Sequence, residues 1–317
     1  MTVLACDLGG TRMKIGVVRD GQVAAQTSVP AHSQAGLVPG LPALAAAWRK
    51  LLDRLKLSPR DCAGISVAFP SLVDAASGRV LAEYGKYADA VDFDLRGWAK
   101  REFNLPLALE NDARLALIGE WKYGAGRGSD NVVMITLGTG LGTAAVIRGR
   151  VLRGQHGQAG VLGGHLTVRY GGRQCRCGNV GCAEAEASSA FLDELARTHP
   201  GFSGSRLATE SRLDFAAVFR HGVAGDPCAV KLRDHSLQVW GTLVVNLIHA
   251  YDPELVVIGG GIMASAGTIL PAIREHVHRH AHTPWGQVRV VAGELGDNAA
   301  LVPGEWLVRE QRPESYR

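Results

Sequence analysis

The stretch "VLACDLGGTRMKIGVVRD", residues 3–20, joins two apolar, β-prone segments through a glycine-rich turn. This pattern predicts a strand, a tight turn and a second strand. Another stretch, "NVVMITLGTGLGTAAVIRGRV" at residues 131–151, repeats the design in the other half of the chain. Repeated strand-turn-strand units favour two similar domains that face each other across a cleft.

The two hairpins superpose at a constant offset along the sequence. Leu8–Thr11 lies over Leu137–Gly140, and residues 17–18 lie over residues 146–147. Short motif matches also arise by chance, and any two glycine-broken hairpins align about this well. From the residues alone, duplication and coincidence therefore both stay open.

The rest of the chain alternates apolar strands with helical patterns, which is typical of an α/β fold. At 317 residues the chain is long for one core, so two domains are the default expectation. We place the domains at residues 1–115 and 116–297, with a C-terminal helix at about 298–317 that packs back on the first. Further strands are expected at 64–70, 106–110, 254–261 and 287–291, and helices at 38–57, 184–198, 226–250 and 265–281.

The composition argues against several classes of protein. The 34 Lys and Arg and the 30 Asp and Glu are spread along the chain, so no basic block marks a nucleic-acid site. The longest apolar runs fall far short of the ~20 residues of a membrane helix, and "MTVLACDLGG" does not resemble a secretory signal. Isolated Cys6, Cys62 and Cys228 fit a reducing compartment. We expect a cytoplasmic protein that binds small molecules, with no nucleic-acid or membrane partner.

The turn in "DLGGTRMK" has the composition of a phosphate site. Gly9 and Gly10 can adopt positive φ and let backbone N–H groups approach an anion. The Thr11 hydroxyl and the Lys14 ammonium suit phosphate oxygens. Asp7, at the strand end, is placed to hold Mg²⁺ through water. The plain alternative is a tight hairpin in which Asp7 only caps the turn.

Two further glycine clusters follow strands. "LGTGLGT" repeats the phosphate-site composition, and the "GGG" after residues 254–258 would let a flat base or ribose pass without a side-chain clash. Neither the P-loop pattern nor the dinucleotide pattern G-x-G-x-x-G is present in the sequence. The candidate nucleotide-binding residues of these clusters are Gly138, Thr139, Gly140, Gly259, Gly260 and Gly261.

The stretch "LENDA" joins a buried strand to a helix. Phosphoryl transfer to a hydroxyl needs a group that accepts the proton, and Asp112 at this corner is a candidate general base. The positive end of the helix would lower its pKa and hold it ionised. Asn111 can both donate to and accept from a sugar hydroxyl. Either residue can instead be the helix N-cap, which is the more common role.

Cys175, Cys177 and Cys182 fall within eight positions of a glycine-rich stretch. Their spacing is too tight for a disulfide framework but suits convergence on one tetrahedral metal ion. Three thiolates need a fourth ligand, which the spacing of the cysteines alone does not identify.

Taken together, these stretches resemble the ROK family (repressor, open reading frame, kinase), a branch of the actin and hexokinase superfamily. "DLGGT" resembles its first phosphate motif, "ENDA" its catalytic motif, "LGTGLG" its second phosphate motif, "VIGGG" its adenosine motif and "CRCGNVGCAE" its zinc signature. The likeness covers nearly the whole chain. It implies an α/β fold of duplicated actin-like ATPase (ribonuclease H-like) domains that flank an active-site cleft.

The resemblance also implies residue roles and cofactors. Asp112 becomes the general base, with Asn111, Glu184 and His165 as substrate-binding residues. His165, separated from Cys175 by nine residues, also completes a Cys₃His zinc shell, and such a closed shell is structural. The implied cofactors are ATP, Mg²⁺ and a structural Zn²⁺. The implied assembly is a homodimer.

One position departs from the family pattern Gly-Glu-Ile-Gly-His. The chain reads "AGVLGGH" at residues 159–165, so Val161 or Leu162 stands where a glutamate would hold a sugar hydroxyl. A sugar oxygen buried there without a partner would cost ~1–3 kcal/mol. Three explanations stay open: the substrate lacks a hydroxyl there, Glu186 or another group substitutes, or phosphorylation is weak or lost.

The sequence therefore favours an ATP- and Mg²⁺-dependent, glucokinase-like kinase of a hexose or hexose derivative, acting at the 6-hydroxyl. A repressor of the same family would carry a winged helix ahead of the first phosphate motif, which here begins at residue 7. The alternative is a non-catalytic sugar-binding or regulatory protein without a DNA-binding domain. The missing glutamate favours that alternative, whereas the intact "DLGGT" and "ENDA" oppose it.

Overall fold

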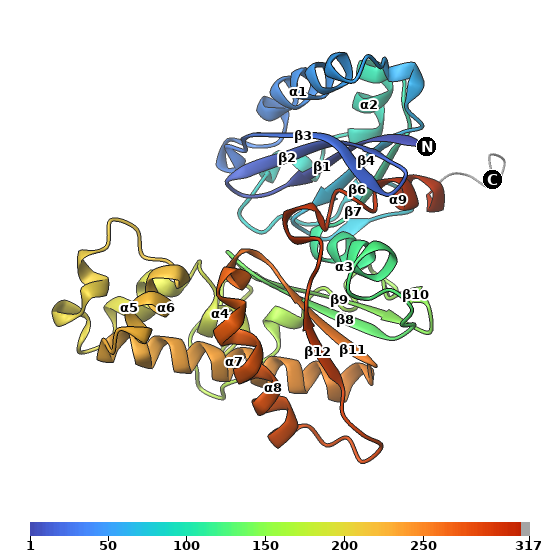
Figure 1. Ribbon diagram of the computed structural model, residues 1–317. Coiled ribbons are helices and arrows are strands. Elements are labelled where there is room, and N and C mark those ends of the chain that lie inside the picture. Colours follow the sequence, from blue (N-terminus) through green and yellow to red (C-terminus); the bar gives the residue numbers. More distant parts are fainter. Residues whose placement is uncertain (312–317) are drawn as a thin grey trace. The chain divides into compact units, whose positions relative to one another are not determined.

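A computed structural model describes residues 1–311 of the chain (Figure 1). The chain divides into two compact units. Unit 1 comprises residues 1–127, 153–159 and 297 onward, and unit 2 comprises residues 128–152 and 160–296. Unit 1 thus extends past the expected boundary at residue 115, because helix α3 (Asp112–Tyr123) packs against the first sheet.

Unit 1 is built on a five-stranded mixed sheet in the order β3-β2-β1-β4-β7 (Figure 1). Its first three strands form an antiparallel meander, and the other two run parallel to β1. The strands are β1 (Thr2–Leu8), β2 (Arg12–Arg19), β3 (Gln22–Pro30), β4 (Ile65–Phe69) and β7 (Leu107–Asn111), with a small hairpin of β5 (Val73–Asp74) and β6 (Arg79–Val80). The helices are α1 (Leu41–Arg54), α2 (Leu95–Phe103), α3 and α9 (Gly304–Glu310).

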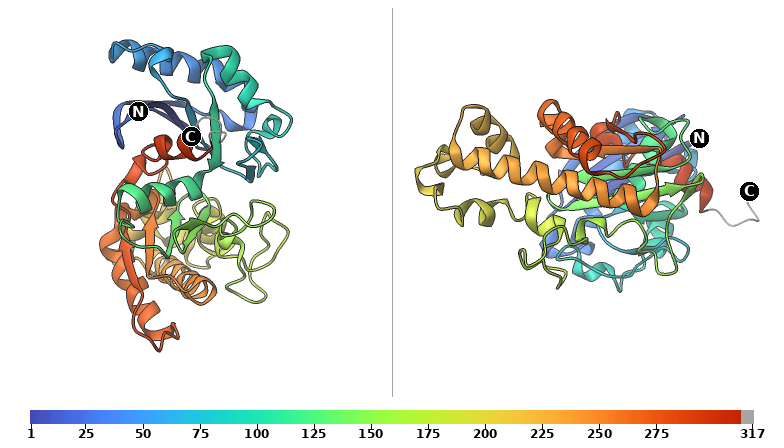
Figure 2. Two further views of the ribbon diagram at one scale, coloured as in Figure 1. Left: turned by 90° about the vertical axis from the view of Figure 1, so that its right-hand side faces the viewer. Right: turned by 90° about the horizontal axis from the view of Figure 1, so that it is seen from below.

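Side-chain alternation along β1 explains how this sheet is covered. Leu4, Cys6 and Leu8 belong to the apolar core that includes α1 and α2, whereas Ala5 faces α9. The left view of Figure 2 shows α1 and α2 on one face of the sheet and α9 on the other. Because strand side chains alternate, Asp7 shares the second face with Ala5.

Unit 2 has a sheet in the order β10-β9-β8-β11-β12. The long helix α7 runs along this sheet with α8 packed beside it (Figure 2), and Trp240 Nε1 donates to the Ala187 carbonyl (2.9 Å). The strands are β8 (Val132–Leu137), β9 (Leu141–Ile147), β10 (Arg150–Val151), β11 (Leu255–Gly259) and β12 (Arg289–Ala292). The helices are α4 (Ala183–Ala187), α5 (Leu192–Arg197), α6 (Phe215–Val223), α7 (Pro227–Tyr251) and α8 (Ala266–His280).

The two sheets share strand order and strand direction, so the predicted duplication is confirmed. In each unit an antiparallel meander of three strands is followed by two strands parallel to the first. The glycine-rich turn joins the first and second strands in both units. The repeat is therefore one of topology as well as of short motifs.

The prediction that the two hairpins align at one constant offset fails after the turn. Leu8 pairs with Met13 in unit 1, whereas Leu137 pairs with Leu141 in unit 2. The turn in unit 2 is one residue shorter, so the predicted overlay of residues 17–18 is displaced by one position.

Several predicted elements differ in extent. The expected helix at 184–198 is interrupted between α4 and α5, because Ser188 is extended. The expected C-terminal helix is shorter, ending at Glu310, and residues 312–317 lie outside the described residues. Between residues 1 and 311, no helix is both long enough and apolar enough to span a membrane.

Candidate functional site

The β1–β2 turn of unit 1 presents two free backbone donors. The amides of Gly10 and Thr11 donate no hydrogen bond within residues 1–311, whereas the Gly9 amide bonds the carbonyls of Asp7 (3.2 Å) and Arg12 (3.0 Å). Neither glycine has positive φ, so the expected reason for glycine here is wrong. Space is the reason instead, because a Cβ at Gly9 would lie 2.7 Å from the Arg12 oxygen. Adjacent free N–H groups bind anions such as phosphate.

Lys14 is less available to a ligand than its motif position predicts. Its ammonium lies 2.8 Å from Asp297 Oδ1 and 3.8 Å from Asp7 Oδ2. Loss of solvation raises the pKa of Asp7, and Lys14 offsets this only in part. Because no described residue donates a hydrogen bond to the Asp7 carboxylate, it keeps acceptor capacity for a hydrated cation.

Asp112 is the first residue of α3 and directly follows β7. Its Oδ1 accepts hydrogen bonds from the Ala113 amide (2.7 Å) and from Asn111 Nδ2 (3.1 Å). Its Oδ2 accepts none from any other described residue. One oxygen is therefore fixed and the other is open, which is the arrangement that a general base needs.

Asn111 is the N-cap of α3, as the alternative for this residue proposed. Its Oδ1 accepts from the Arg114 amide (3.0 Å), and its Nδ2 donates to the Ser71 carbonyl (3.1 Å) and to Asp112. Asn111 thus orients the candidate base. Its predicted contact to a sugar hydroxyl stays a prediction, and it would have to share one of these bonds.

The surroundings of Asp112 raise its pKa to about 6. Desolvation is the largest cause and nearby Asp7 adds to it, while the Ala113 amide and Lys86 oppose it. The expectation that the helix end lowers this pKa is therefore wrong in its net direction, because burial outweighs the helix terminus. A carboxyl with this pKa is a stronger base than an exposed aspartate and is still mostly ionised at neutral pH.

A buried ion network, which the sequence motifs did not identify, supports this corner. Glu110 is fully buried and accepts from Arg114 Nη1 (2.8 Å) and Arg153 Nη2 (2.7 Å). Arg114 also donates to two carbonyls of residues 153–159, which belong to unit 1. The signal in the sequence was the Glu–Arg pair at i, i+4 around Asp112.

The β8–β9 turn of unit 2 also has free backbone donors. The amides of Thr139 and Gly140 donate no hydrogen bond within the described chain. The carbonyls of Gly138 and Thr139 accept from the amides of Ser189 and Ala190 (both 3.0 Å). With two occupied carbonyls and two free amides, this turn also has the polarity of an anion site.

Glu184, a predicted sugar contact, lies in the first turn of α4 and reaches the β8–β9 turn. Its Oε2 accepts from the Leu141 amide (2.9 Å), and a Cβ at Gly140 would overlap that oxygen. Its Oε1 accepts no hydrogen bond from the described residues. Unit 2 therefore holds an open carboxylate oxygen close to its free amides.

The third glycine cluster lies at the end of β11 and packs on the end of β8. Gly260 has a φ of 94°, and a Cβ there would overlap the Leu137 carbonyl, so glycine is required on both grounds. At Gly259 a Cβ would lie 2.7 Å from Met134 Cε, whereas the space around Gly261 is open. The second and third predicted nucleotide clusters are thus neighbours in unit 2.

His165, Cys175, Cys177 and Cys182 converge in unit 2, with ligand atoms that all lie within 4.8 Å of one another. The His165 Nδ1 is 3.6 Å from Cys175 Sγ, and Cys177 Sγ is 3.7 Å from Cys182 Sγ. Tetrahedral Zn–S bonds of ~2.3 Å place sulfur atoms about 3.8 Å apart. The four residues therefore fit a closed Cys₃His zinc shell. The predicted contact of His165 with substrate stays a prediction.

The position of the missing glutamate is apolar in the structure. Val161 is buried and Leu162 is half-buried. The Thr143 hydroxyl fixes this segment by donating to the Gly160 carbonyl (2.5 Å) and accepting from the Gly163 amide (2.8 Å). Neither apolar side chain can accept a hydrogen bond from a sugar hydroxyl.

Glu186, suggested as a substitute for the missing carboxylate, is held by the loop that carries the cysteines. It is fully buried, and its Oε1 accepts from the Arg173 amide (2.7 Å). Its Oε2 accepts no well-aligned hydrogen bond but lies 3.3 Å from His235 Nε2 and 3.5 Å from Arg169 Nη1. Glu186 thus braces the loop of residues 169–182 that carries the three cysteines (the metal-binding loop), and its role as a substitute sugar contact stays a prediction.

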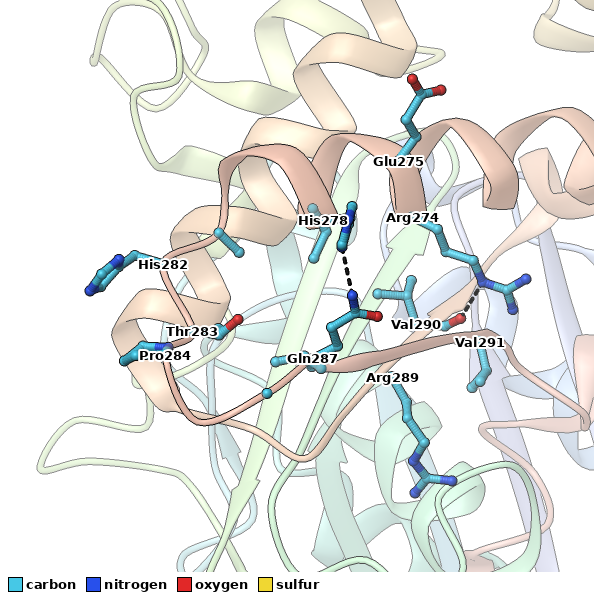
Figure 3. A pocket seen from close by; sticks show the side chains of 14 residues that line it. Arg274, Glu275, His278, His282, Thr283, Pro284, Gln287, Arg289, Val290 and Val291 are labelled. Atoms are coloured by element: carbon cyan, nitrogen blue, oxygen red, sulfur yellow. Dashed lines mark hydrogen bonds between the residues drawn. The ribbon is translucent and has the colours of Figure 1, made fainter.

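A cavity of about 950 Å³ lies apart from these residues, between α8 and β12 of unit 2 (Figure 3). Its polar lining includes Arg274, His278, Gln287 and Arg289. His278 Nδ1 lies 2.7 Å from the Gln287 amide, and Arg274 donates to the Val290 carbonyl (2.8 Å). None of the candidate site residues lines this cavity, so it is not the predicted nucleotide or sugar site.

Three comparisons place the chain among known proteins. The ROK family model matches residues 3–311. The chain is 31% identical over 314 residues to a glucokinase of Halalkalibacterium halodurans, covering 96% of this chain and 94% of that protein. It resembles the structure of a ROK family glucokinase from Streptomyces griseus in complex with glucose and AMPPNP, with a TM-score of 0.81, 28% identity and coverage of 98% of this chain and 100% of that one.

A ROK hexokinase from Thermus thermophilus is also similar, with a TM-score of 0.76, 30% identity and 97% of both chains covered. The α/β fold is thus that of the ROK glucokinase structures, the actin-like ATPase fold. The match along nearly the whole sequence shows that this chain belongs to the ROK family.

Proposed function

We propose that this protein is a sugar kinase that transfers the γ-phosphoryl group of ATP to a hydroxyl of a hexose or hexose derivative. The observation that carries the proposal is the Asp112 carboxylate, with one oxygen fixed, one open and a pKa of about 6. Membership of the ROK family and likeness to glucokinases support sugar phosphorylation in general.

In the proposed reaction, Asp112 Oδ2 takes the proton of the acceptor hydroxyl while the sugar oxygen attacks the γ-phosphorus. The acceptor is the 6-hydroxyl. The free amides of each glycine-rich turn bind phosphate oxygens, and each turn holds its own amides in place. Asp7 would hold Mg²⁺, and the ion would supply positive charge against the phosphate oxygens.

The sugar is bound by groups of unit 2. Glu184 Oε1 is open to a sugar hydroxyl, and the Cys₃His cluster, as a structural zinc site, fixes the loop that precedes Glu184. The apolar Leu162 favours an acceptor that lacks a free hydroxyl at the position a glutamate would bind. We therefore expect a modified hexose to be a better acceptor than glucose.

The test is ADP release from Mg-ATP against hexoses, deoxy sugars, amino sugars and N-acetyl sugars, with the product identified by phosphorus NMR. The proposal expects one class of acceptor to raise ADP release far above the sugar-free rate, with phosphate on the 6-oxygen. The 6-deoxy form of that acceptor should be inert. If ATP binds and every sugar leaves the rate at background, the non-catalytic sugar-binding alternative takes its place.

A further inference from the structure

Lys86 is a lysine that no sequence motif singled out. It lies between the β5–β6 hairpin and the 3₁₀ turn at Ala88–Ala90, and it is half-buried. It makes no hydrogen bond or ion pair within residues 1–311. An ammonium without a hydrogen-bonded partner can donate to an anionic ligand.

The segment that carries Lys86 is anchored to the glycine-rich turn of unit 1. The buried Tyr87 hydroxyl donates to the Gly9 carbonyl (2.8 Å), and the Ser33 hydroxyl donates to the Gly10 carbonyl (2.7 Å). The Tyr87 amide donates to the Ser33 carbonyl (2.8 Å), so the two anchoring residues are also bonded to each other. These bonds occupy the carbonyls of the turn, and they hold Lys86 beside the amides that stay free.

The backbone on both sides of Lys86 is left-handed. Gly85 has a φ of 71° and Tyr87 has a φ of 56°. Such a conformation is uncommon for tyrosine and persists where the surrounding contacts impose it, often at functional sites. The contacts that impose it here are the ones that Tyr87 makes with the phosphate-type turn.

The Lys86 side chain lies across Gly10. A Cβ at Gly10 would be 2.9 Å from Lys86 Cε and 3.4 Å from its Nζ, so the end of the lysine side chain lies directly against the turn. The ammonium also lowers the pKa values of Asp7 and Asp112, against the larger effect of burial. Lys14, by contrast, already has a carboxylate 2.8 Å away.

We propose that Lys86 binds the γ-phosphoryl group of ATP and stabilises it during transfer, a role that rests on the kinase function proposed above. In that step the bond from the β–γ bridging oxygen to the γ-phosphorus breaks, and its electron pair leaves with ADP. The bond from the sugar oxygen to phosphorus forms, and the hydroxyl proton goes to Asp112. The positive charge of Lys86 offsets the negative charge on the oxygens of the moving phosphoryl group.

Nucleotide binding tests this role without turnover. Lys86→Met should weaken AMPPNP binding about tenfold or more and change ADP binding less than about twofold, because only the triphosphate reaches the lysine. Lys86→Arg should restore much of the difference. Lys50→Met, on the exposed side of α1, is the matched control and should change neither affinity. Equal losses for AMPPNP and ADP, or no loss for either, would overturn the proposal.

Turnover separates this inference from the proposed function. With the best acceptor, Lys86→Met should lower kcat about 10²–10³-fold while the sugar KM changes little. A wild-type protein that phosphorylates no sugar, with the AMPPNP-specific loss still present in Lys86→Met, would overturn the kinase function and keep Lys86 as a phosphate ligand. A Lys86→Met protein with wild-type kcat would overturn the role of Lys86 and leave the kinase function standing.

Discussion

The glycine-rich turns of the two units differ in length and in side chains but share a pair of free backbone amides. Each turn follows the first strand of its meander and leaves two consecutive amides free. In unit 1, Asp7 pairs with Lys14 across the two strands, whereas in unit 2 Thr136 pairs with Gly142 at the same place. Both units therefore have free backbone donors in the turn, but only unit 1 has charged side chains on the strand pair beside it.

This difference indicates a division of roles between the units. The charged turn belongs to the unit that carries Asp112 and Lys86, which suits proton and phosphoryl transfer. The neutral turn belongs to the unit that carries Glu184, the cluster at residues 259–261 and the metal-binding loop, which suits recognition. Changes in unit 1 should therefore act mainly on kcat, and changes in unit 2 mainly on the sugar KM.

The largest effect is expected at Asp112. Asp112→Asn keeps an oxygen for the Ala113 amide but removes the base, so kcat should fall roughly 10²–10⁴-fold with nucleotide affinity nearly unchanged. A coupled assay of ADP release and a nucleotide titration measure the two quantities. A variant that retains most of its activity would remove Asp112 from the mechanism and end the proposed division of roles.

A smaller effect on catalysis is expected at the metal-binding loop. Cys177 is the exposed ligand of the cluster, so Cys177→Ser removes a ligand without opening a cavity in the core. Zinc should fall from about one per chain to near zero, and the sugar KM should rise about tenfold with a smaller change for ATP. Elemental analysis and steady-state kinetics measure this, with Cys62→Ser as the control. A wild-type protein that is active and stable without zinc would contradict it.

The unit 2 turn offers a matched pair of glycines. Gly140→Ala would push a methyl group into Glu184 Oε2, whereas a Cβ at Gly138 has nothing nearer than the Gly140 oxygen, 3.9 Å away. We expect kcat/KM for the sugar to fall about tenfold in Gly140→Ala and less than about threefold in Gly138→Ala. Equal effects would mean that the position of Glu184 over the turn has no role in binding the sugar.

The smallest effect concerns stability. A carboxyl whose folded pKa is raised from 3.8 to about 6 destabilises the folded state when ionised; this cost is absent below 3.8 and complete above about 6. Asp112→Asn should therefore raise the free energy of unfolding at about pH 8 by on the order of 1 kcal/mol and leave it unchanged near pH 4. Denaturant unfolding at both pH values measures this. An equal gain at both would point to a cause other than ionisation.

The sequence predicted the parts of the site that short segments determine. The spacing of Cys175, Cys177 and Cys182, with His165 added by family resemblance, anticipated a cluster that the fold brings within 4.8 Å. The strand-to-helix corner likewise placed Asp112 at the start of α3. In both cases the decisive distances are set by residues close together in the chain.

Lys86 shows what the sequence could not predict. Its position over Gly10 depends on hydrogen bonds from Tyr87 and Ser33 that join three separate segments, and no periodicity or spacing relates them. The same limit applies to the pKa of Asp112, because burial depends on the folded surroundings. The homodimer and the absence of a nucleic-acid partner stay predictions.

The pH dependence of kcat/KM for the best acceptor tests the central claim most directly. With Asp112 as the base, its pKa of about 6 predicts a rate that is level above about pH 7 and falls about tenfold per pH unit below about 6. The residual rate of Asp112→Asn should not fall at acidic pH in this way. This comparison distinguishes titration of the Asp112 carboxyl from titration of ATP. A wild-type profile that stays level down to about pH 4.5, or a fall at acidic pH that persists in Asp112→Asn, would contradict the assignment.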